Sequence, residues 1–133
     1  MIQATRAAMN NIVCLDASVL LESVLQGRKN VSKAQQYIES HNVIISPLTA
    51  HLFIYFGQKD GLNLDLLLDL LLKHQFTDLG TTELLWAAKN CQDKGFEDAL
   101  QIACALTSHC TEFVTFDKDL AKRYKSFIAI TLL

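Results

Sequence analysis

The chain has 133 residues, of which half are hydrophobic and a fifth are charged. This length suits one domain with one buried core, and this composition excludes intrinsic disorder as the state of most of the chain. The formal net charge of -2 gives the protein no overall attraction to nucleic acid, so any such binding requires a local basic surface.

The N-terminal residues 1–10 precede the first predicted strand and lack the long apolar core of a signal peptide. We interpret them as a flexible tail and residues 11–133 as a single domain. The longest apolar stretch, LNLDLLLDLLL at 62–72, is interrupted by two aspartates and is shorter than the roughly 20 residues of a membrane span. We therefore expect a cytoplasmic protein that has no contact with a membrane.

Strand patterns alternate with helix patterns along the rest of the chain. Short apolar or β-branched runs predict strands at 11–16, 43–46, 112–117 and 126–133. Apolar residues at helical spacing, with glycines between several of the segments, predict helices at 17–27, 31–42, 47–61, 62–74, 81–95, 96–110 and 118–124. Short apolar strands separated by helices favour an α/β domain whose parallel sheet carries helices on its faces.

Aspartates stand at the ends of two predicted strands. Asp16 ends the first strand, and Asp117 ends a late one. Because ligands of open parallel sheets bind beyond the carboxyl ends of the strands, both carboxylates are expected at the same edge. A third acid, Asp98, lies in the first turn of the helix predicted at 96–110. Each acid alone is also explained as a helix cap, whereas three acids at one edge repel one another unless a cation lies between them.

Four segments of the chain together resemble a known family. IVCLDASVLL, ISPLTAH, FEDALQIACAL and FVTFDKDLA follow the order and approximate spacing of the PIN-domain ribonucleases, in particular the VapC-type toxins of bacterial toxin-antitoxin pairs. The resemblance covers nearly all of the chain after residue 10. It implies a PIN-like three-layer sandwich with a central, mostly parallel sheet flanked by helices. It also implies a metal-dependent endoribonuclease that uses Mg²⁺ or Mn²⁺, forms a homodimer and is inhibited by an antitoxin protein.

The resemblance also implies roles for individual residues. By position, Asp16, Asp98 and Asp117 match the catalytic, metal-binding acids of the family, and Asp119 matches a further acid of many relatives. Ser18 matches a serine or threonine that supports the first acid. These carboxylate oxygens suit magnesium, which binds hard ligands and keeps waters for exchange with a substrate phosphate.

One position departs from the family pattern. Family members usually carry a glutamate three residues after the threonine in S-x-L-T-x-x-E, and Leu52 stands there with His51 beside it. The missing carboxylate can be replaced by Glu22, Glu83, Asp119 or His51. Without a replacement, the alternative is a catalytically impaired PIN-like domain that binds RNA or a protein partner without cleavage.

Four basic residues follow the last acidic strand end: Lys118, Lys122, Arg123 and Lys125. We expect them to contact RNA phosphates on either side of the scissile bond. An ordinary solvated helix face is the alternative interpretation.

The apolar content of 48–72 exceeds the needs of one small core, since it includes Leu52, Phe53, Tyr55 and Phe56. We interpret part of this segment as a dimer face or as a groove for a partner helix. Burial of the whole segment in the core is the alternative.

Overall fold

The protein is described here by a computed structural model covering residues 11–25, 27–91 and 95–133, so the predicted tail at 1–10 lies outside the described residues. One sheet has the strand order β3-β2-β1-β4-β5. Its neighbouring strands are all parallel, which confirms the expected sheet type. The strands are β1 (Ile12–Leu15), β2 (Asn42–Ile45), β3 (Gln75–Phe76), β4 (Glu112–Thr115) and β5 (Ala129–Leu132).

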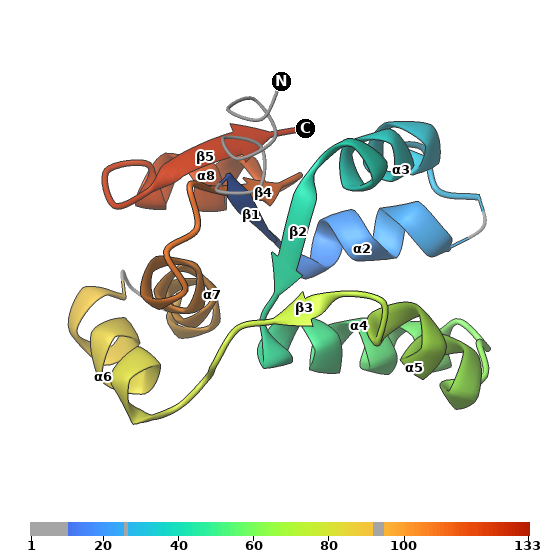
Figure 1. Ribbon diagram of the computed structural model, residues 1–133, viewed down its shortest axis with the longest axis horizontal. Helices are drawn as coiled ribbons and strands as arrows, with labels where there is room; N and C mark the ends of the chain where they lie inside the picture. Colours follow the sequence, from blue (N-terminus) through green and yellow to red (C-terminus); the bar gives the residue numbers. More distant parts are fainter. Residues whose placement is uncertain (1–10, 26, 92–94) are drawn as a thin grey trace, which may run out of the picture.

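Helices cover both faces of the sheet. In Figure 1, α2 to α5 lie together on the right of the view and α6 and α7 lie on the left, with β1 and β2 between the two groups. The predicted three-layer α/β sandwich is therefore confirmed. The helices are α2 (Ala17–Val24), α3 (Val31–Ser40), α4 (Pro47–Lys59), α5 (Leu64–Leu71), α6 (Thr81–Asn90), α7 (Phe96–Thr107) and α8 (Lys118–Tyr124).

The strands are apolar along their length because they are buried on both sides. Val13 and Leu15 of β1 pack with residues of α2 to α5, whereas Cys14 between them packs with residues of α6 to α8. The same division separates Val114 from Phe113 in β4. Successive side chains of a strand point to opposite faces, so a run without polar residues supplies both halves of the core.

The chain leaves β1 and β4 in opposite directions. From β1 it passes through α2 and α3 to β2 on one side, and from β4 it passes through α8 to β5 on the other side. β1 and β4 are themselves neighbours in the sheet. Such a reversal of strand order is the place where open α/β sheets bind ligands, beyond the carboxyl ends of the strands. The residues directly after Leu15 and Thr115 therefore lie where a ligand is expected to bind.

Strand β3 was not predicted from the sequence. It has two residues, both exposed, and it pairs with Ile44 and Ile45 at the edge of the sheet. Two residues are too few to show the alternation that predicts a strand. No helix in the described ranges is long and apolar enough to cross a membrane.

Candidate active site

Asp16 is held in a fixed orientation directly after β1. The residue is 7% exposed, and its backbone N donates to Val114 O at 2.9 Å, which joins the ends of β1 and β4. Its Oδ2 accepts hydrogen bonds from Thr115 Oγ1 at 2.6 Å and from Ser18 Oγ at 2.9 Å. Two hydroxyl donors on one carboxylate oxygen fix its direction. Ser18 thus contacts the first acid directly.

Asp117 is linked to Asp16 through one buried hydroxyl. The backbone N of Asp117 donates to Thr115 Oγ1 at 3.0 Å, and this hydroxyl donates in turn to Asp16. Asp117 also caps α8, because its Oδ1 accepts from the backbone N of Asp119 at 2.9 Å and of Leu120 at 3.2 Å. The capping explanation therefore holds for Asp117, and the cap fixes this carboxylate beside the end of β1. Asp119 is exposed in the first turn of α8.

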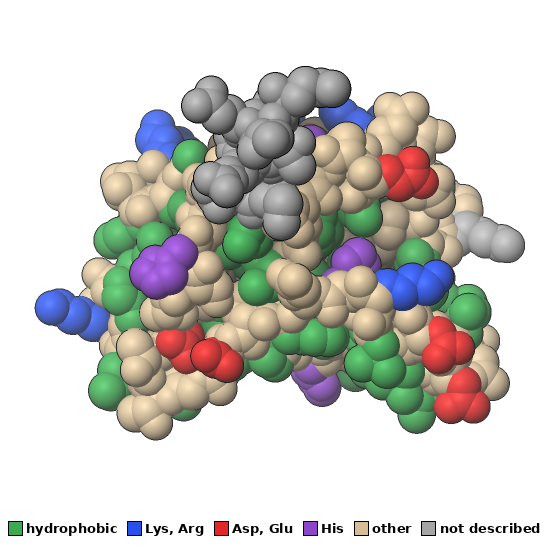
Figure 2. Space-filling view, viewed as in Figure 1, with side chains coloured by type: hydrophobic (Ala, Val, Ile, Leu, Met, Phe, Trp, Pro, Cys, Tyr) green, Lys and Arg blue, Asp and Glu red, His purple; other side chains and the backbone are tan. Residues whose placement is uncertain are grey.

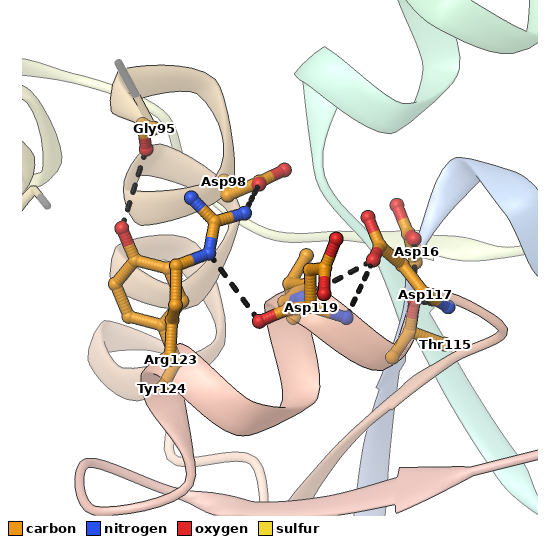
Figure 3. Close-up of polar contacts among 9 residues, drawn as sticks. Asp16, Gly95, Asp98, Thr115, Asp117, Asp119, Arg123 and Tyr124 are labelled. Atoms are coloured by element: carbon orange, nitrogen blue, oxygen red, sulfur yellow. Dashed lines mark hydrogen bonds and ion pairs between the residues drawn. The ribbon is translucent and has the colours of Figure 1, made fainter. Parts of the chain in front are cut away.

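Asp98 lies in the first turn of α7 and faces the other two acids. Its Oδ2 is 2.7 Å from Arg123 Nη2, in an ion pair between α7 and α8 (Figure 3). Burial raises the pKa of the Asp98 carboxyl above its ordinary value, and the guanidinium opposes this rise. The negative charges of Asp16 and Asp117 raise the same pKa further. The Asp98 carboxylate is thus near enough to the other two acids to be affected by their charges.

A buried polar chain ties α4 and α7 to the end of β1. Thr49 Oγ1 lies 2.9 Å from Gln101 Oε1 and 3.3 Å from Leu15 O, the residue before Asp16. Both polar side chains are almost fully buried, and Gln101 follows Asp98 by one helical turn. Sequence reasoning missed this chain. The signal for it was a glutamine inside the apolar run LQIACAL, which needs a buried partner.

The donor set suits a hard divalent ion in kind, because its acids supply carboxylate oxygens. Among the residues that the structure describes, however, no group of three or more His, Cys, Asp or Glu side chains could hold a metal ion as the side chains stand. One of the three acids, Asp98, is paired with Arg123 instead.

Of the proposed replacements for the missing glutamate, Asp119 lies next to one of the three acids, since its backbone N donates to Asp117 Oδ1. Leu52 is half-buried in α4, and His51 beside it is exposed. Glu22 pairs with Arg28 at 3.7 Å. Glu83 is buried and accepts a hydrogen bond from the backbone at the start of α6. Glu22 and Glu83 therefore have structural partners of their own.

The four predicted RNA-binding residues fall into two groups. Lys118, Lys122 and Lys125 are exposed. Arg123 is half-buried and pairs with Asp98, a contact that the sequence analysis did not predict. The three lysines are therefore open to solvent, whereas Arg123 is engaged by Asp98.

Parallel strands, helices on both faces and acids at the reversal of strand order define an open α/β domain with acidic residues beyond the ends of β1 and β4. A family model described as "PIN domain" matches residues 13–126 of this chain, and the chain belongs to the PIN-domain family. The resemblance stated from four sequence segments is thereby confirmed. None of the curated protein sequences matches the chain.

Solved structures of toxins and toxin-antitoxin complexes share this fold. VapC20 of Mycobacterium tuberculosis, a toxin that cleaves the sarcin-ricin loop, superposes with a TM-score of 0.70 at 12% identity, over 83% of this chain and 93% of that one. A toxin-antitoxin complex from Klebsiella pneumoniae gives 0.71 at 15% identity, over 90% and 95%. VapBC2 of Rickettsia felis, bound to a DNA fragment from its promoter, gives 0.67 at 12% identity, over 92% and 98%. At such low sequence identities, these comparisons show that the fold is shared and nothing more.

Proposed function

We propose that the protein is a metal-dependent endoribonuclease, the toxin of a type II toxin-antitoxin system that acts in the cytoplasm. Membership of the PIN-domain family and the fold shared with VapC toxins support the class. The observation that carries the proposal is that Asp16 and Asp117 follow the neighbouring strands β1 and β4 at the reversal of strand order, and that their charges act on Asp98.

The proposed chemistry is hydrolysis of an RNA phosphodiester bond. A divalent ion, Mg²⁺ or Mn²⁺, supplies positive charge for the phosphate in the transition state and activates the attacking water. Asp16, Asp98 and Asp117 would hold it, directly or through water, with Asp119 as an outer ligand. Hydrogen bonds from Thr115 and Ser18 hold the Asp16 carboxylate in one orientation, and the cap of α8 does the same for Asp117. Pre-oriented ligands of this kind reduce the cost of reorganisation during the reaction.

The exposed lysines have a separate role in this proposal. Lys118, Lys122 and Lys125 contact phosphates on either side of the scissile bond and bring a polyanion to an acidic site. They lie on or directly after α8, the helix that Asp117 caps, so the same element positions a ligand and the RNA backbone.

RNA cleavage in the presence of Mg²⁺ or Mn²⁺ tests the proposal when Asp16→Asn is assayed beside Asp65→Asn. The first variant keeps an oxygen acceptor for Ser18 and Thr115 but removes the charge, so we expect cleavage to fall by at least about 100-fold. The second removes an exposed acid of α5, and its cleavage should equal that of the wild type. Equal cleavage by both variants would contradict the proposal.

A second function is favoured by two specific observations. Leu52 stands where the family pattern has a glutamate, and Asp98 is held by Arg123. Both features weaken the attraction for a divalent ion. A PIN-like domain that binds RNA or a protein partner without cleaving is therefore the second candidate. Absence of both cleavage and Mn²⁺ binding in the wild-type protein would support it over the nuclease.

An antitoxin and a second copy of the chain are the proposed protein partners. Large apolar side chains are exposed on α4 and α5, where Figure 2 shows them gathered at the lower right beside acidic side chains. The exposed set is Tyr55, Phe56, Leu64, Leu66, Leu68 and Leu72. An exposed apolar surface of this kind commonly marks a protein interface. We assign it to the homodimer, and the antitoxin is proposed from the complexes that share the fold.

A further inference from the structure

Arg123 is held from several sides. Its Nη2 lies 2.7 Å from Asp98 Oδ2, and its Nε donates to the backbone oxygen of Asp119 at 3.3 Å. Its guanidinium carbon is 5.8 Å from the centroid of the Tyr124 ring. Tyr124 is buried, and its hydroxyl donates to Gly95 O at 3.3 Å, next to the start of α7. These contacts fix α8 against α7 and place the guanidinium at Asp98 (Figure 3).

The ion pair supplies positive charge to the acidic edge. The Arg123 and Asp98 side chains are 31% and 24% exposed, so water screens their attraction less than on an open surface. Asp98 also feels the negative charges of Asp16 and Asp117. The positive charge of the guanidinium therefore offsets the repulsion that Asp98 experiences from the other two acids. A bound cation would have the same effect among clustered carboxylates.

The missing glutamate helps Arg123 to compete with a divalent ion for Asp98. With Leu52 in place of an acid, the site attracts a divalent ion through fewer carboxylates. A guanidinium that is already bonded to Asp98 competes better against such a weakened site than against a complete one. Leu52 and the Arg123–Asp98 pair thus both lower the affinity of the site for a divalent ion.

We propose that Arg123 is a built-in counterion of the acidic edge, which pairs with Asp98 when no divalent ion is bound and releases it when an ion binds. This inference rests on the proposed function, since it assigns a divalent ion to the site. The released guanidinium lies beside the exposed lysines of α8. Its planar set of donors suits an RNA phosphate. Binding of the ion would thus free the Arg123 guanidinium to bind a phosphate.

Titration with Mn²⁺ tests the inference on three variants. The electron paramagnetic resonance signal of free Mn²⁺ reports how much of the ion is unbound. Arg123→Met removes the charge at Asp98, and we expect it to bind Mn²⁺ on the order of tenfold more tightly than the wild type. Arg123→Lys keeps the charge without the planar fork and should lie between them. Lys33→Met removes an exposed charge of α3 and should match the wild type. Equal or weaker binding by Arg123→Met overturns the inference.

A second measurement uses the wild-type protein and does not depend on the variants folding well. The Nε–Hε resonance of Arg123 is expected to shift when Mg²⁺ is added, because the guanidinium leaves Asp98. An unchanged resonance in protein that binds Mg²⁺ overturns the counterion. The outcomes separate the two proposals. If neither the wild type nor Arg123→Met binds Mn²⁺, the proposed function is contradicted together with the counterion role of Arg123. If both bind Mn²⁺ equally, only the counterion role is contradicted.

Discussion

Leu52 is the residue whose identity most affects the proposed ion site. Leu52→Glu restores the carboxylate of the family pattern on α4, so we expect Mn²⁺ affinity to rise on the order of tenfold. The uncharged Leu52→Gln has nearly the same size and serves as the matched control. Calorimetric titration of both variants gives the comparison, and equal affinities would show that position 52 does not reach the ion.

The Thr115 hydroxyl joins the two strand-end acids. Thr115→Val keeps the shape of the side chain but removes a hydrogen bond to the Asp16 carboxylate, so we expect a loss of about 1–3 kcal/mol in the free energy of unfolding. Cleavage should also fall, because Asp16 loses a fixed direction. Thr111→Val, on an exposed side chain, should change stability by less than about 0.5 kcal/mol. Denaturant unfolding measures both, and similar losses would contradict this role of Thr115.

The sequence predicted the strand-end acids because position alone determines where they lie. Asp16 and Asp117 follow apolar strands, and parallel strands bring their carboxyl ends to one edge. The pairing of Arg123 with Asp98 could not be predicted in this way. The two residues belong to different helices, and their meeting depends on how α7 packs against α8. A basic run on a helix gives no sign of which residue turns inward.

At the scale of elements, helix α8 carries the proposed RNA contacts. Replacing Lys118, Lys122 and Lys125 with alanine should weaken RNA binding and reduce the slope of log affinity against log salt by roughly 0.7 for each phosphate that the variant no longer neutralises. Arg123 stays in this variant, so the Asp98 pair is kept. Binding measured between low and moderate salt checks the slope, and an unchanged slope would mean that α8 does not meet the RNA backbone.

His74, just after α5, gives the helical layer a dependence on pH. It lines a cavity of ≈ 480 Å³ between α2, α3, α4 and α5, with Glu39 and Lys73 as the other charged residues of its wall. Burial lowers the pKa of His74 below its ordinary value of 6.5, and the charge of Lys73 lowers it further. The unfolded chain therefore binds more protons below pH 6.5, and the folded state loses stability as the pH falls through that range.

His74→Gln should remove this loss, because a neutral amide takes up no proton. Unfolding in denaturant at pH 7.5 and 5.5 measures it, with the exposed His51→Gln as control. The wild type and His51→Gln are expected to lose more stability between the two pH values than His74→Gln. Equal losses in all three proteins would show that His74 titrates alike in the folded and unfolded states.

Helices and strands differ in how well the sequence predicted them. The helices were found where their apolar spacing placed them, with several ends two to five residues earlier than predicted, as for α6, which ends at Asn90. Strand β3 was missed because an edge strand of two exposed residues leaves no pattern. Its presence depends on pairing with β2, which is a tertiary interaction.

At the scale of the whole molecule, the apolar surface of α4 and α5 predicts association. Leu72 is 72% exposed and Tyr55 is 52% exposed, which is costly for large side chains on a monomer. We expect a homodimer in sedimentation equilibrium. Leu68→Glu with Leu72→Glu should shift it towards monomer, whereas Leu85→Glu, on the exposed face of α6, should not. A monomeric wild type that stays soluble would contradict the assignment.

The central claim is that Asp16, Asp98 and Asp117 share one divalent ion at the reversal of strand order. Crystals soaked in Mn²⁺ and measured for anomalous scattering test this claim most directly. We expect one strong peak bonded to oxygens of these acids or to their waters, with Arg123 turned away from Asp98. A structure in which Mn²⁺ is absent from this edge, with the Arg123 pair intact at saturating Mn²⁺, would contradict it.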